Sequence, residues 1–375
     1  MNRGFYLTLM MGPFNASPVP RAVIDALTEV QVTSTVGSQG GFQLKLTLAK
    51  QSPVQQMLVG GQFDPRTRVI IAVTVNGATE VLMDGIITKQ DITPDSKPGK
   101  STLTLTGLDL TALMDFIDLT GIPYPALPNF LIVEAILAKY IPLGVTPVAI
   151  PNAIPQIENP LSSFIKQSGT DYAFINTMGR ETGWIFYLDP GPTPGKSMAY
   201  WGPDLSQMFG STQSAISINF DGNTNIDSLN FSYDGTLATQ WLVTIIEPIT
   251  KLPIPIPVPS IDIFKPRLSS QAPTVLKVTQ LTPVANEDFP GAASAALAKM
   301  FDTAEVVTGS GQLDVLRYGQ VFKARMRAAV RGAGGYFDGQ YYVKSVTHNI
   351  KRGEYKQSFS LARGGVGSAV STVSV

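Results

Sequence analysis

The side chains that most enzymes use for catalysis are scarce in this sequence. Cysteine is absent, and histidine occurs once among 375 residues, as His348. A chain without cysteine has no disulfide, no thiolate nucleophile and no zinc–thiolate site, and a single histidine excludes a multi-histidine metal site. A Ser-His-Asp triad would have to use His348, which lies in an alternating strand pattern. We therefore expect His348 to be packed in the core or at an interface.

Two segments resemble the end of a phosphate-binding loop. The sequence Pro-Gly-Lys-Ser occurs at 98–101 and again at 194–197. A phosphate-binding loop needs a glycine five positions before its last glycine, and those positions hold Pro94 and Pro190. We expect lysine-tipped turns and no bound nucleotide.

A third segment resembles a calcium loop. Oxygen-bearing side chains alternate between residues 221 and 227. A calcium loop of the EF-hand type needs glycine at its sixth position and glutamate at its twelfth, where this chain has Ile226 and Ser232. The segment predicts a turn rich in Asp and Asn, and the sequence predicts neither a metal ion nor another cofactor.

Carboxylates and aromatic residues leave two further functions open. A cell-wall glycosidase needs a pair of carboxylates whose separation depends on the fold, and an adhesin could bind sugars on an aromatic platform. The candidate carboxylates are Asp109, Asp115, Asp118, Glu158, Asp171 and Glu181, and the aromatic candidates lie between Tyr172 and Trp201. Capping carboxylates and aromatic core packing are the simpler interpretations.

Positive charge gathers near the carboxyl end of an otherwise neutral chain. Ten Lys or Arg residues and two acidic residues lie between Arg317 and Arg363, while the net charge of the whole chain is zero. The neutral total gives no reason to expect specific nucleic-acid binding. The local excess indicates either a solvated face or a basic wall that faces an acidic partner or a channel. The candidate partner-facing or lumen residues are Arg325, Arg327, Lys344, Lys351, Arg352, Lys356 and Arg363.

The composition favours a protein that hides much of its surface. Hydrophobic residues make up 44% of the chain and charged residues only 15%, against about a quarter for soluble domains. This pattern is typical of assemblies and of membrane proteins. No run of 18 apolar residues occurs, so we expect no membrane-spanning helix. The first residues, MNRGFYLTLMMGPF, make a poor signal peptide.

Hydrophobic periodicity divides the chain into three blocks. Residues 1–110 alternate as strands joined by turns, which predicts an antiparallel β-sandwich or barrel. Residues 111–205 predict a small α/β domain with helices over Phe130–Tyr140, Pro160–Gln167 and Asp171–Thr182. Residues 206–365 return to strands, and 366–375 read as a flexible tail.

Three features stand out in the last block. The segment KLPIPIPVP at 251–259 has alternating prolines, which cannot donate to a ladder, so it predicts an extended polyproline-like arm. Residues Ala292–Ala304 predict an alanine-rich helix. Tyr342–Ile350 and Tyr355–Leu361 alternate around Gly353 and predict a closing β-hairpin. Such a hairpin needs a sheet made earlier in the chain to pair with.

The order of these pieces resembles the baseplate hub proteins of contractile injection systems, namely the phage late-control D proteins and the hub half of type VI spike proteins. The matching segments are PVPRAVIDALTEVQVTST, GGFQLKLTL, DGIITKQDITPDSKPGKSTLTLTGLDLTALMD, DYAFINTMGRETGWIFYLDP, AYWGPD and DGQYYVKSVTHNIKRGEYKQSFSLAR. They extend over most of the chain, and their order and spacing together carry the resemblance.

The resemblance implies both an architecture and a role. It implies a mainly β (α+β) fold with two tail-tube-like antiparallel β-barrel domains that flank a small α/β insertion. It implies a homotrimer that adapts a six-fold inner tube to a three-fold spike, with baseplate wedge proteins around it, and no enzymatic activity. Such a particle is assembled in the bacterial cytoplasm as a virion or an injection device.

One departure from the type VI members changes the expected partners. Those proteins continue into a small barrel and a β-helical needle, and this sequence of 375 residues shows no such repeats. We therefore expect a separate spike protein. The proline-rich arm at 251–259 has no counterpart in the family pattern, and we expect it to contact a neighbouring subunit.

Overall fold

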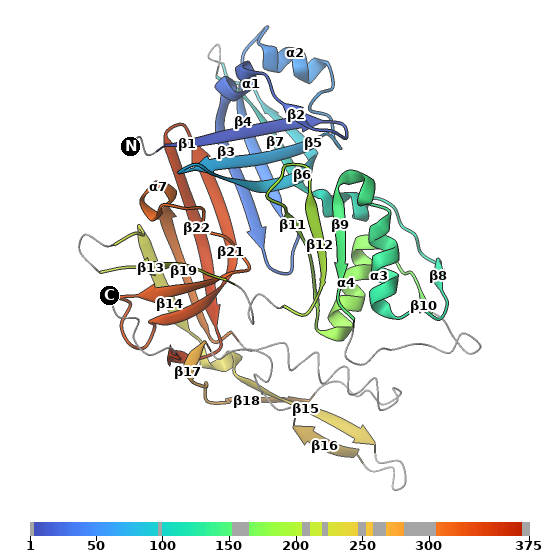
Figure 1. Ribbon diagram of the computed structural model, residues 1–375, viewed down its shortest axis with the longest axis vertical. Helices are drawn as coiled ribbons and strands as arrows, with labels where there is room; N and C mark the ends of the chain where they lie inside the picture. The colour runs from blue at the N-terminus through green and yellow to red at the C-terminus, as the bar shows by residue number, and fades with distance from the viewer. Residues whose placement is uncertain are drawn as a thin grey trace.

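The chain is organised around one large, mostly antiparallel sheet of 13 strands (Figure 1). The computed structural model describes residues 4–96, 100–151, 165–204, 211–219, 224–246, 253–257, 268–280 and 305–369. Helices are few and short, so the predicted mainly β class is confirmed. The described strands follow an open path, and no closed barrel is found among them. The closed form of the two predicted barrels is therefore not observed.

Apart from the two-residue strand β2, which pairs with β1 at the edge of the sheet, the first β unit holds six strands in the spatial order β3-β4-β7-β6-β5-β1. Its elements are β1 (Phe5–Gly12), β2 (Ser17–Pro18), α1 (Arg21–Ala26), β3 (Leu27–Thr35), β4 (Gly41–Leu48), α2 (Pro53–Val59), β5 (Arg68–Val75), β6 (Ala78–Thr93) and β7 (Ser101–Asp109). The predicted period of two holds on β4, where every second side chain is buried. The turn between β5 and β6 uses Asn76 and Gly77 at φ of 50° and 86°, as a type I′ hairpin requires.

The second β unit holds six strands in the spatial order β14-β19-β22-β21-β20-β13. Its elements are β13 (Thr212–Ser217), β14 (Ser228–Tyr233), β19 (Val307–Asp314), α7 (Val315–Tyr318), β20 (Arg327–Arg331), β21 (Gly339–Lys351) and β22 (Glu354–Arg363). When the six strands of each unit are numbered along the chain, their spatial order is 2-3-6-5-4-1 in both units. The two units therefore repeat one topology.

Local details of the two units also correspond. In each unit a short helix, α2 or α7, follows the third strand. The loop after it reaches an arginine with positive φ, 77° at Arg66 and 61° at Arg325. The backbone N–H of Arg66 donates to Ile87, and that of Arg325 donates to Val343. A bulge follows each acceptor residue. One difference is that β1 runs antiparallel to β5, whereas β13 runs parallel to β20.

The closing hairpin joins the two units. Strand β21 pairs with β22 on one side, and from Ser345 to Lys351 it pairs with β3 of the first unit on the other. The predicted hairpin and its need for an earlier strand are confirmed. Both strands of the hairpin lie inside the sheet, because β22 pairs with β19 and β21 pairs with β3. One hydrophobic core runs continuously through both units.

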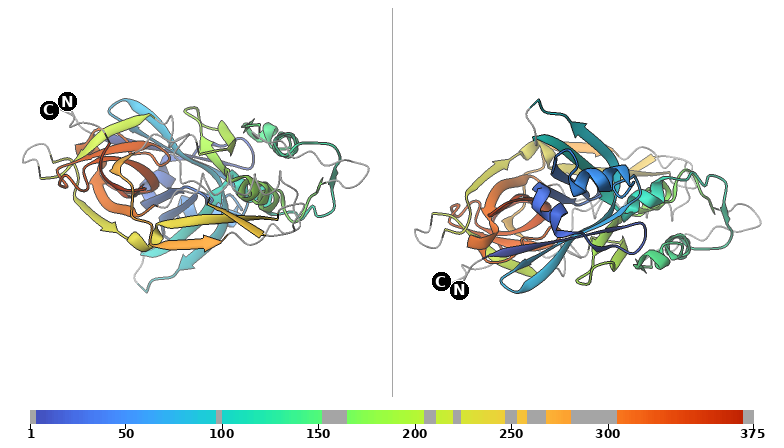
Figure 2. Two further views of the ribbon diagram at one scale, coloured as in Figure 1. Left: turned by 90° about the horizontal axis from the view of Figure 1, so that it is seen from below. Right: turned by 90° about the horizontal axis from the view of Figure 1, so that it is seen from above.

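The insertion between the units is a small α/β domain with its own core. Its elements are η1 (Leu110–Asp115), β8 (Pro123–Tyr124), α3 (Asn129–Ala138), η2 (Ile141–Leu143), β9 (Val145–Ala149), β10 (Ile165–Lys166), α4 (Asp171–Thr182), β11 (Ile185–Pro190) and β12 (Ser197–Gly202). Figure 2 shows its helices to one side of the β units. The predicted helix at Pro160–Gln167 is wrong at its end, because Ile165–Lys166 pairs with β8 as a strand; residues 160–164 lie outside the described ranges.

The proline-rich segment belongs to a second insertion, between β14 and β19, that extends from the lower end of the molecule (Figure 1). It contains η4 (Gly235–Leu237), β15 (Thr239–Ile246), β16 (Pro253–Pro257), β17 (Ser269–Gln271) and β18 (Lys277–Gln280). The polyproline-like arm is corrected to an edge strand, because β16 pairs antiparallel with β15. Proline is tolerated there since one side of an edge strand needs no partner. The predicted helix at 292–304 lies outside the described residues.

The start of the predicted flexible tail is ordered. Strand β23 (Val366–Ser368) pairs with β17. Residues 370–375 lie outside the described ranges. Within those ranges no helix is long and apolar enough to cross a membrane.

A buried ion pair fastens the first insertion to the first unit. The guanidinium of Arg68 donates to both carboxylate oxygens of Asp84, at 2.8 and 2.7 Å. It also donates to the backbone carbonyls of Leu143, at 2.8 Å, and Phe14, at 3.1 Å. The hydroxyl of Ser197 lies 3.3 Å from Asp84. The sequence offers only a weak signal for this pair: Asp84 interrupts an apolar run, and Arg68 immediately precedes one.

Candidate partner-facing surface

The basic segment near the carboxyl end is largely neutralised by carboxylates from elsewhere in the chain. Six of its cations form ion pairs with acids outside the segment. These pairs are Arg317–Asp227, Lys323–Glu80, Arg325–Asp189, Lys344–Glu305, Lys351–Glu29 and Lys356–Asp227. The local excess of positive charge in the sequence therefore does not become a uniformly basic wall in the fold.

The most exposed candidates lie at the turn of the closing hairpin. Lys351 is 53% exposed, and its Nζ lies 3.6 Å from a carboxylate oxygen of Glu29. Arg352 is exposed and donates to the backbone carbonyl of Asp25. Glu29 also binds Lys45 at 2.7 Å, and these contacts lower the pKa of Glu29. The carboxylate of Glu29 thus serves both Lys45 and Lys351.

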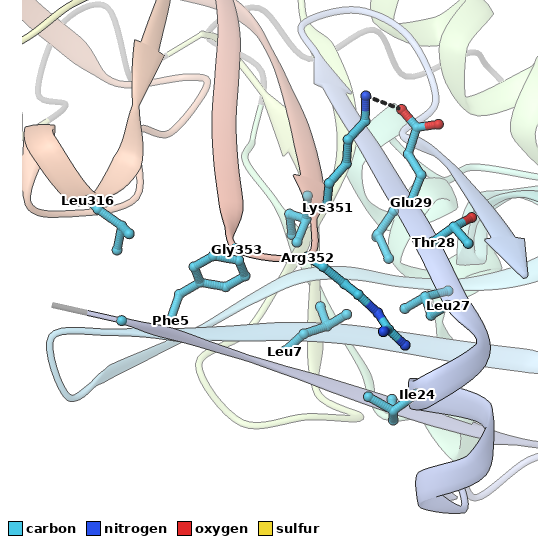
Figure 3. A pocket seen from close by; sticks show the side chains of 13 residues that line it. Phe5, Leu7, Ile24, Leu27, Thr28, Glu29, Leu316, Lys351, Arg352 and Gly353 are labelled. Atoms are coloured by element: carbon cyan, nitrogen blue, oxygen red, sulfur yellow. Dashed lines mark ion pairs between the residues drawn. The ribbon is translucent and has the colours of Figure 1, made fainter. Parts of the chain in front are cut away.

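An apolar groove lies beside that turn (Figure 3). It has a volume of about 340 Å³ and separates β1 from α1, the start of β3 and the hairpin turn. Leu7, Ile24 and Leu27 line it, and Arg352 extends across it from the turn. The groove combines an aliphatic floor with a cationic rim at the junction of the two β units.

Two further candidates, Lys344 and Lys356, are half-buried and paired. The Nζ of Lys344 lies 2.7 Å from Glu305 and 5.9 Å from the centre of the Tyr342 ring. Lys356 lies 3.4 Å from Glu354 and 3.6 Å from Asp227, and these carboxylates raise the pKa of Lys356. The side chains of Lys344 and Lys356 are 31% and 35% exposed.

Arg325 and Arg327 lie inside contacts of the chain with itself. The side chain of Arg325 is 9% exposed, and its guanidinium stacks 4.3 Å from the centre of the Tyr187 ring in β11. Arg325 thereby connects the second unit to the first insertion. Arg327 is half-buried in β20 between Thr212 and Tyr342.

The structure corrects the position of Arg363. This residue is 1% exposed. Its guanidinium donates to the carbonyls of Gly365 at 2.8 Å, Asp338 at 2.9 Å and Tyr336 at 3.1 Å, and it stacks 4.3 Å from the centre of the Tyr341 ring. Burial lowers the pKa of Arg363 from its usual value. Arg363 holds two loops together and is not a surface group of the chain.

Replacement of Arg363 by lysine is expected to destabilise the fold. Lysine has no planar fork that can reach three carbonyls at once and stack on a ring, so Arg363→Lys should cost about 2–4 kcal/mol by leaving buried acceptors unpaired. Chemical denaturation of both proteins measures this difference. Lys356→Met is the control, since Lys356 is partly exposed and solvent screens its ion pairs, so that its replacement should cost much less. Equal losses in the two variants would contradict the assigned role.

His348 is packed in the core, as the sequence predicts. It is 5% exposed. Its Nδ1 lies 2.7 Å from the hydroxyl of Tyr355 and 3.2 Å from the side-chain nitrogen of Gln357. Burial lowers the pKa of His348 to about 3, so the ring is neutral at physiological pH. In that form Nδ1 accepts from its neighbours, which is a structural role.

The carboxylates of the insertion cap and pair within the fold. Asp171 is 2% exposed and binds Lys139 at 2.5 Å and Tyr140 at 2.7 Å. Asp171 and Glu181 lie near opposite ends of α4, which separates them by about 15 Å along the axis. A glycosidase pair is about 5–9.5 Å apart. Asp171 and Glu181 therefore do not form such a pair, and Glu158 lies outside the described residues.

The three carboxylates at the start of the insertion, Asp109, Asp115 and Asp118, are also bound locally. Asp109 accepts the backbone N–H of Gly40 at 2.6 Å and caps η1 through Thr111; its burial raises the pKa of Asp109. Asp115 accepts from Thr170, and Asp118 accepts from Thr120. These contacts are the capping roles that sequence analysis held as the simpler interpretation.

The aromatic candidates pack inward. Trp201 is fully buried, and its ring centre lies 4.6 Å from that of Trp184. Tyr200 is buried as well. The core of the insertion accounts for these rings, and no observation indicates a sugar-binding platform.

The calcium-like and phosphate-like segments show no site in the part that the structure describes. Asn225 donates to the Ala215 carbonyl and accepts from the Ser217 backbone. Residues 220–223 and 97–99 lie outside the described ranges. Gly195 lies in a turn at φ of 78°. No cluster of His, Asp or Glu able to hold a metal ion occurs among the described residues.

Comparison with solved structures finds the same fold in phage tail proteins. The tail protein of Neisseria meningitidis MC58 superposes with a TM-score of 0.61 at 12% identity, over 97% of this chain and 98% of the other. The chain has a tail-protein fold. The 43 kDa tail protein of prophage MuSo2 from Shewanella oneidensis gives a TM-score of 0.61 at 11% identity, over 96% of this chain and 99% of the other.

A component of the type VI secretion system has the same fold. This Escherichia coli protein, described as similar to the T4 tail proteins gp27 and gp5, gives a TM-score of 0.56 at 12% identity over 92% of this chain and 76% of the other. No family model and no curated protein matches the sequence. The resemblance to hub proteins read from the sequence is thus confirmed at the level of the fold.

Proposed function

We propose that this chain is the structural hub of a phage-tail baseplate or a contractile injection system, with three copies joined in a ring. The observation that carries the proposal is the internal repeat, in which both β units have the strand order 2-3-6-5-4-1. A ring of three copies contains six β units that share one strand order, although it contains only three chains. Such a ring can match a six-fold tube on one side and a three-fold spike on the other.

The two units then act as the tube-like domains, and the first insertion lies beside them. In an assembled ring the open sheets would continue from unit to unit instead of closing into separate barrels. The full-length likeness to tail proteins supports this role. The low charge content of the chain fits a protein with extensive contacts to other subunits.

The proposed partners are the inner tube protein, a separate spike protein and the baseplate wedge proteins. The protein acts by symmetry matching and performs no catalysis. The hairpin turn with Lys351 and Arg352, together with Lys356, is the proposed partner-facing surface, because these cations are the most accessible of the predicted set. Assembly in the bacterial cytoplasm into a virion or an injection particle follows from this role.

Molar mass in solution tests the proposal. Light scattering of the purified chain is expected to give three times the chain mass, and addition of its tube and spike proteins should give a larger complex that contains three copies of the chain. Images of the particle should show the ring between tube and spike. A chain that stays monomeric with both partners present would contradict it.

A further inference from the structure

The junction between the two β units reveals how a free sheet edge is covered. Beyond its bulge, β21 pairs with β3 over Ser345–Lys351. The carbonyl of Lys344 accepts the backbone N–H of Val36 at 2.9 Å. Because strand residues alternate, the backbone groups of Val346 and His348 also face β3.

The first unit has the corresponding edge, and no strand covers it in the described part of the chain. Counted from the bulge in each strand, Thr88 of β6 corresponds to Lys344 of β21, and Ile92 corresponds to His348. Beyond the bulge, Lys89–Thr93 pairs with β7 on one side only. Ile92 is 51% exposed, whereas His348 in the covered strand is 5% exposed. The backbone groups of Gln90 and Ile92 face away from β7.

The second unit has the strand that corresponds to β3. Strand β14 begins the sheet path and pairs only with β19 among the described strands. Phe231 of β14 lies opposite Gly309 of β19, and Val32 of β3 lies opposite Phe42 of β4, so Phe231 occupies the position that corresponds to Val32. The backbone N–H of Asp234 donates to the carbonyl of Val306, the residue that precedes β19. Because strand residues alternate, the backbone groups of Phe231 and Tyr233 face away from β19.

We infer that β6 of one copy pairs antiparallel with β14 of the next copy, in the register that β21 and β3 use within the chain. Ile92 then lies opposite Phe231, and Gln90 lies opposite Tyr233. Lys89 lies opposite Asp234, an attractive pairing of charges. Figure 1 shows β6 in the upper unit and β14 in the lower one. Because the contact joins different edges, it runs head to tail around a ring.

The chemistry of the two edges fits this contact. Four backbone hydrogen bonds can form between Gln90, Ile92, Tyr233 and Phe231. Ile92 would lie beside Phe231, whose ring stacks 5.1 Å from that of Phe337. The polar face of the new pair would hold Asp91 opposite Ser232, as Thr347 lies opposite Thr33 within the chain.

The loop beside β6 leaves room for the incoming strand. Phe63 and Phe322 each precede the positive-φ arginine by three residues, and both side chains are fully buried. In the second unit a loop of this kind is present although β21 pairs with β3. The first unit has the same backbone contact between its loop and the strand, from Arg66 to Ile87, and in addition the side chain of Gln90 donates to the carbonyl of Phe63 at 2.6 Å. That contact uses the side chain of Gln90 and leaves its backbone groups available to an added strand.

Cysteine cross-linking tests this register, and the chain has no cysteine of its own. Asp91 and Ser232 would form a pair without mutual backbone hydrogen bonds, with Cα atoms about 4.5 Å apart, within the range for a disulfide. The double variant Asp91→Cys/Ser232→Cys is expected to oxidise almost completely to a species of three chains on a denaturing gel without reductant. The control Lys89→Cys/Asn230→Cys uses the same strands and face but is misaligned by four residues, about 13 Å, and should not cross-link.

The inference rests on the proposed ring, and the outcomes separate the two. If light scattering shows a three-chain assembly but Asp91→Cys/Ser232→Cys does not cross-link, the inferred contact is wrong. The hub proposal would then still stand. Equal cross-linking of both variants would overturn the register. A protein that remains monomeric with its tube and spike partners would overturn both.

Discussion

Replacing Arg68 by methionine is expected to lower the free energy of unfolding by about 3–5 kcal/mol, the cost of leaving a buried charge without its partner. The side chain of Asp84 is 1% exposed and that of Arg68 is 7% exposed. Without the guanidinium, the Asp84 carboxylate keeps only the hydroxyl of Ser197 at 3.3 Å. Denaturant unfolding measures the loss.

The same variant should loosen the first insertion from the first unit. Arg68 donates to the carbonyls of Leu143 and Gly195 in the insertion and to that of Phe14 beside β1, so its loss leaves three partly buried acceptors without this donor. Hydrogen exchange is expected to rise at η2 and at the 190–197 turn before global unfolding.

A second substitution separates charge burial from packing. In Arg68→Met/Asp84→Leu no unpaired charge remains, and apolar replacement of a buried ion pair is often neutral. The double variant should therefore be more stable than Arg68→Met alone. If it is less stable, the carboxylate is not the source of the loss and the assignment is wrong.

Stability should fall as the pH is lowered from 6.5 towards 3, because of His348. Burial lowers the pKa of His348 from 6.5 to about 3 in the folded chain. In this window the unfolded state binds a proton that the folded state excludes, so the folded state loses up to about 1.4 kcal/mol per pH unit. Above pH 6.5 both states are neutral at this residue, and it contributes no pH dependence.

The sole histidine makes this prediction easy to isolate. His348→Asn keeps a side-chain oxygen that can accept from Tyr355, and it cannot titrate. Unfolding free energies of the two proteins, measured from pH 8 to pH 4, should differ in slope below pH 6.5, with the variant less sensitive. Carboxylates titrate in both proteins and cancel in the comparison. Parallel curves would show that His348 is accessible to protons in the fold.

Local patterns predicted most of the secondary structure. Strands β4 and β14 and the closing hairpin follow from period-two alternation, since a strand with one buried face requires it. Helix α4 has a threonine cap at Thr170 and ends at Gly183 with φ of 72°, and both signals are visible in the sequence. Helix α2 was missed, although Ser52 and Pro53 mark its start.

Longer-range features were beyond local patterns. The prolines of β16 exclude a central strand but do not exclude an edge strand, and only the position of β15 decided between an arm and an edge. The repeat of strand order in the two units was equally hidden. Strand order depends on which segments pair, whereas the residues at equivalent positions, such as Ile92 and His348, differ in type.

The sequence by itself excluded disulfides, thiolate sites and multi-histidine metal sites, and it determined which segments form strands, because residue types and their spacing are local properties. The tertiary structure decided where the charges go. Arg363 became a buried clamp, and Lys323, Lys344 and Lys351 found carboxylates more than 30 residues away along the chain. Ion pairing depends on distance in space, which the order of residues does not specify. The same reason explains why the two sheet edges that no described strand covers became visible only in the fold.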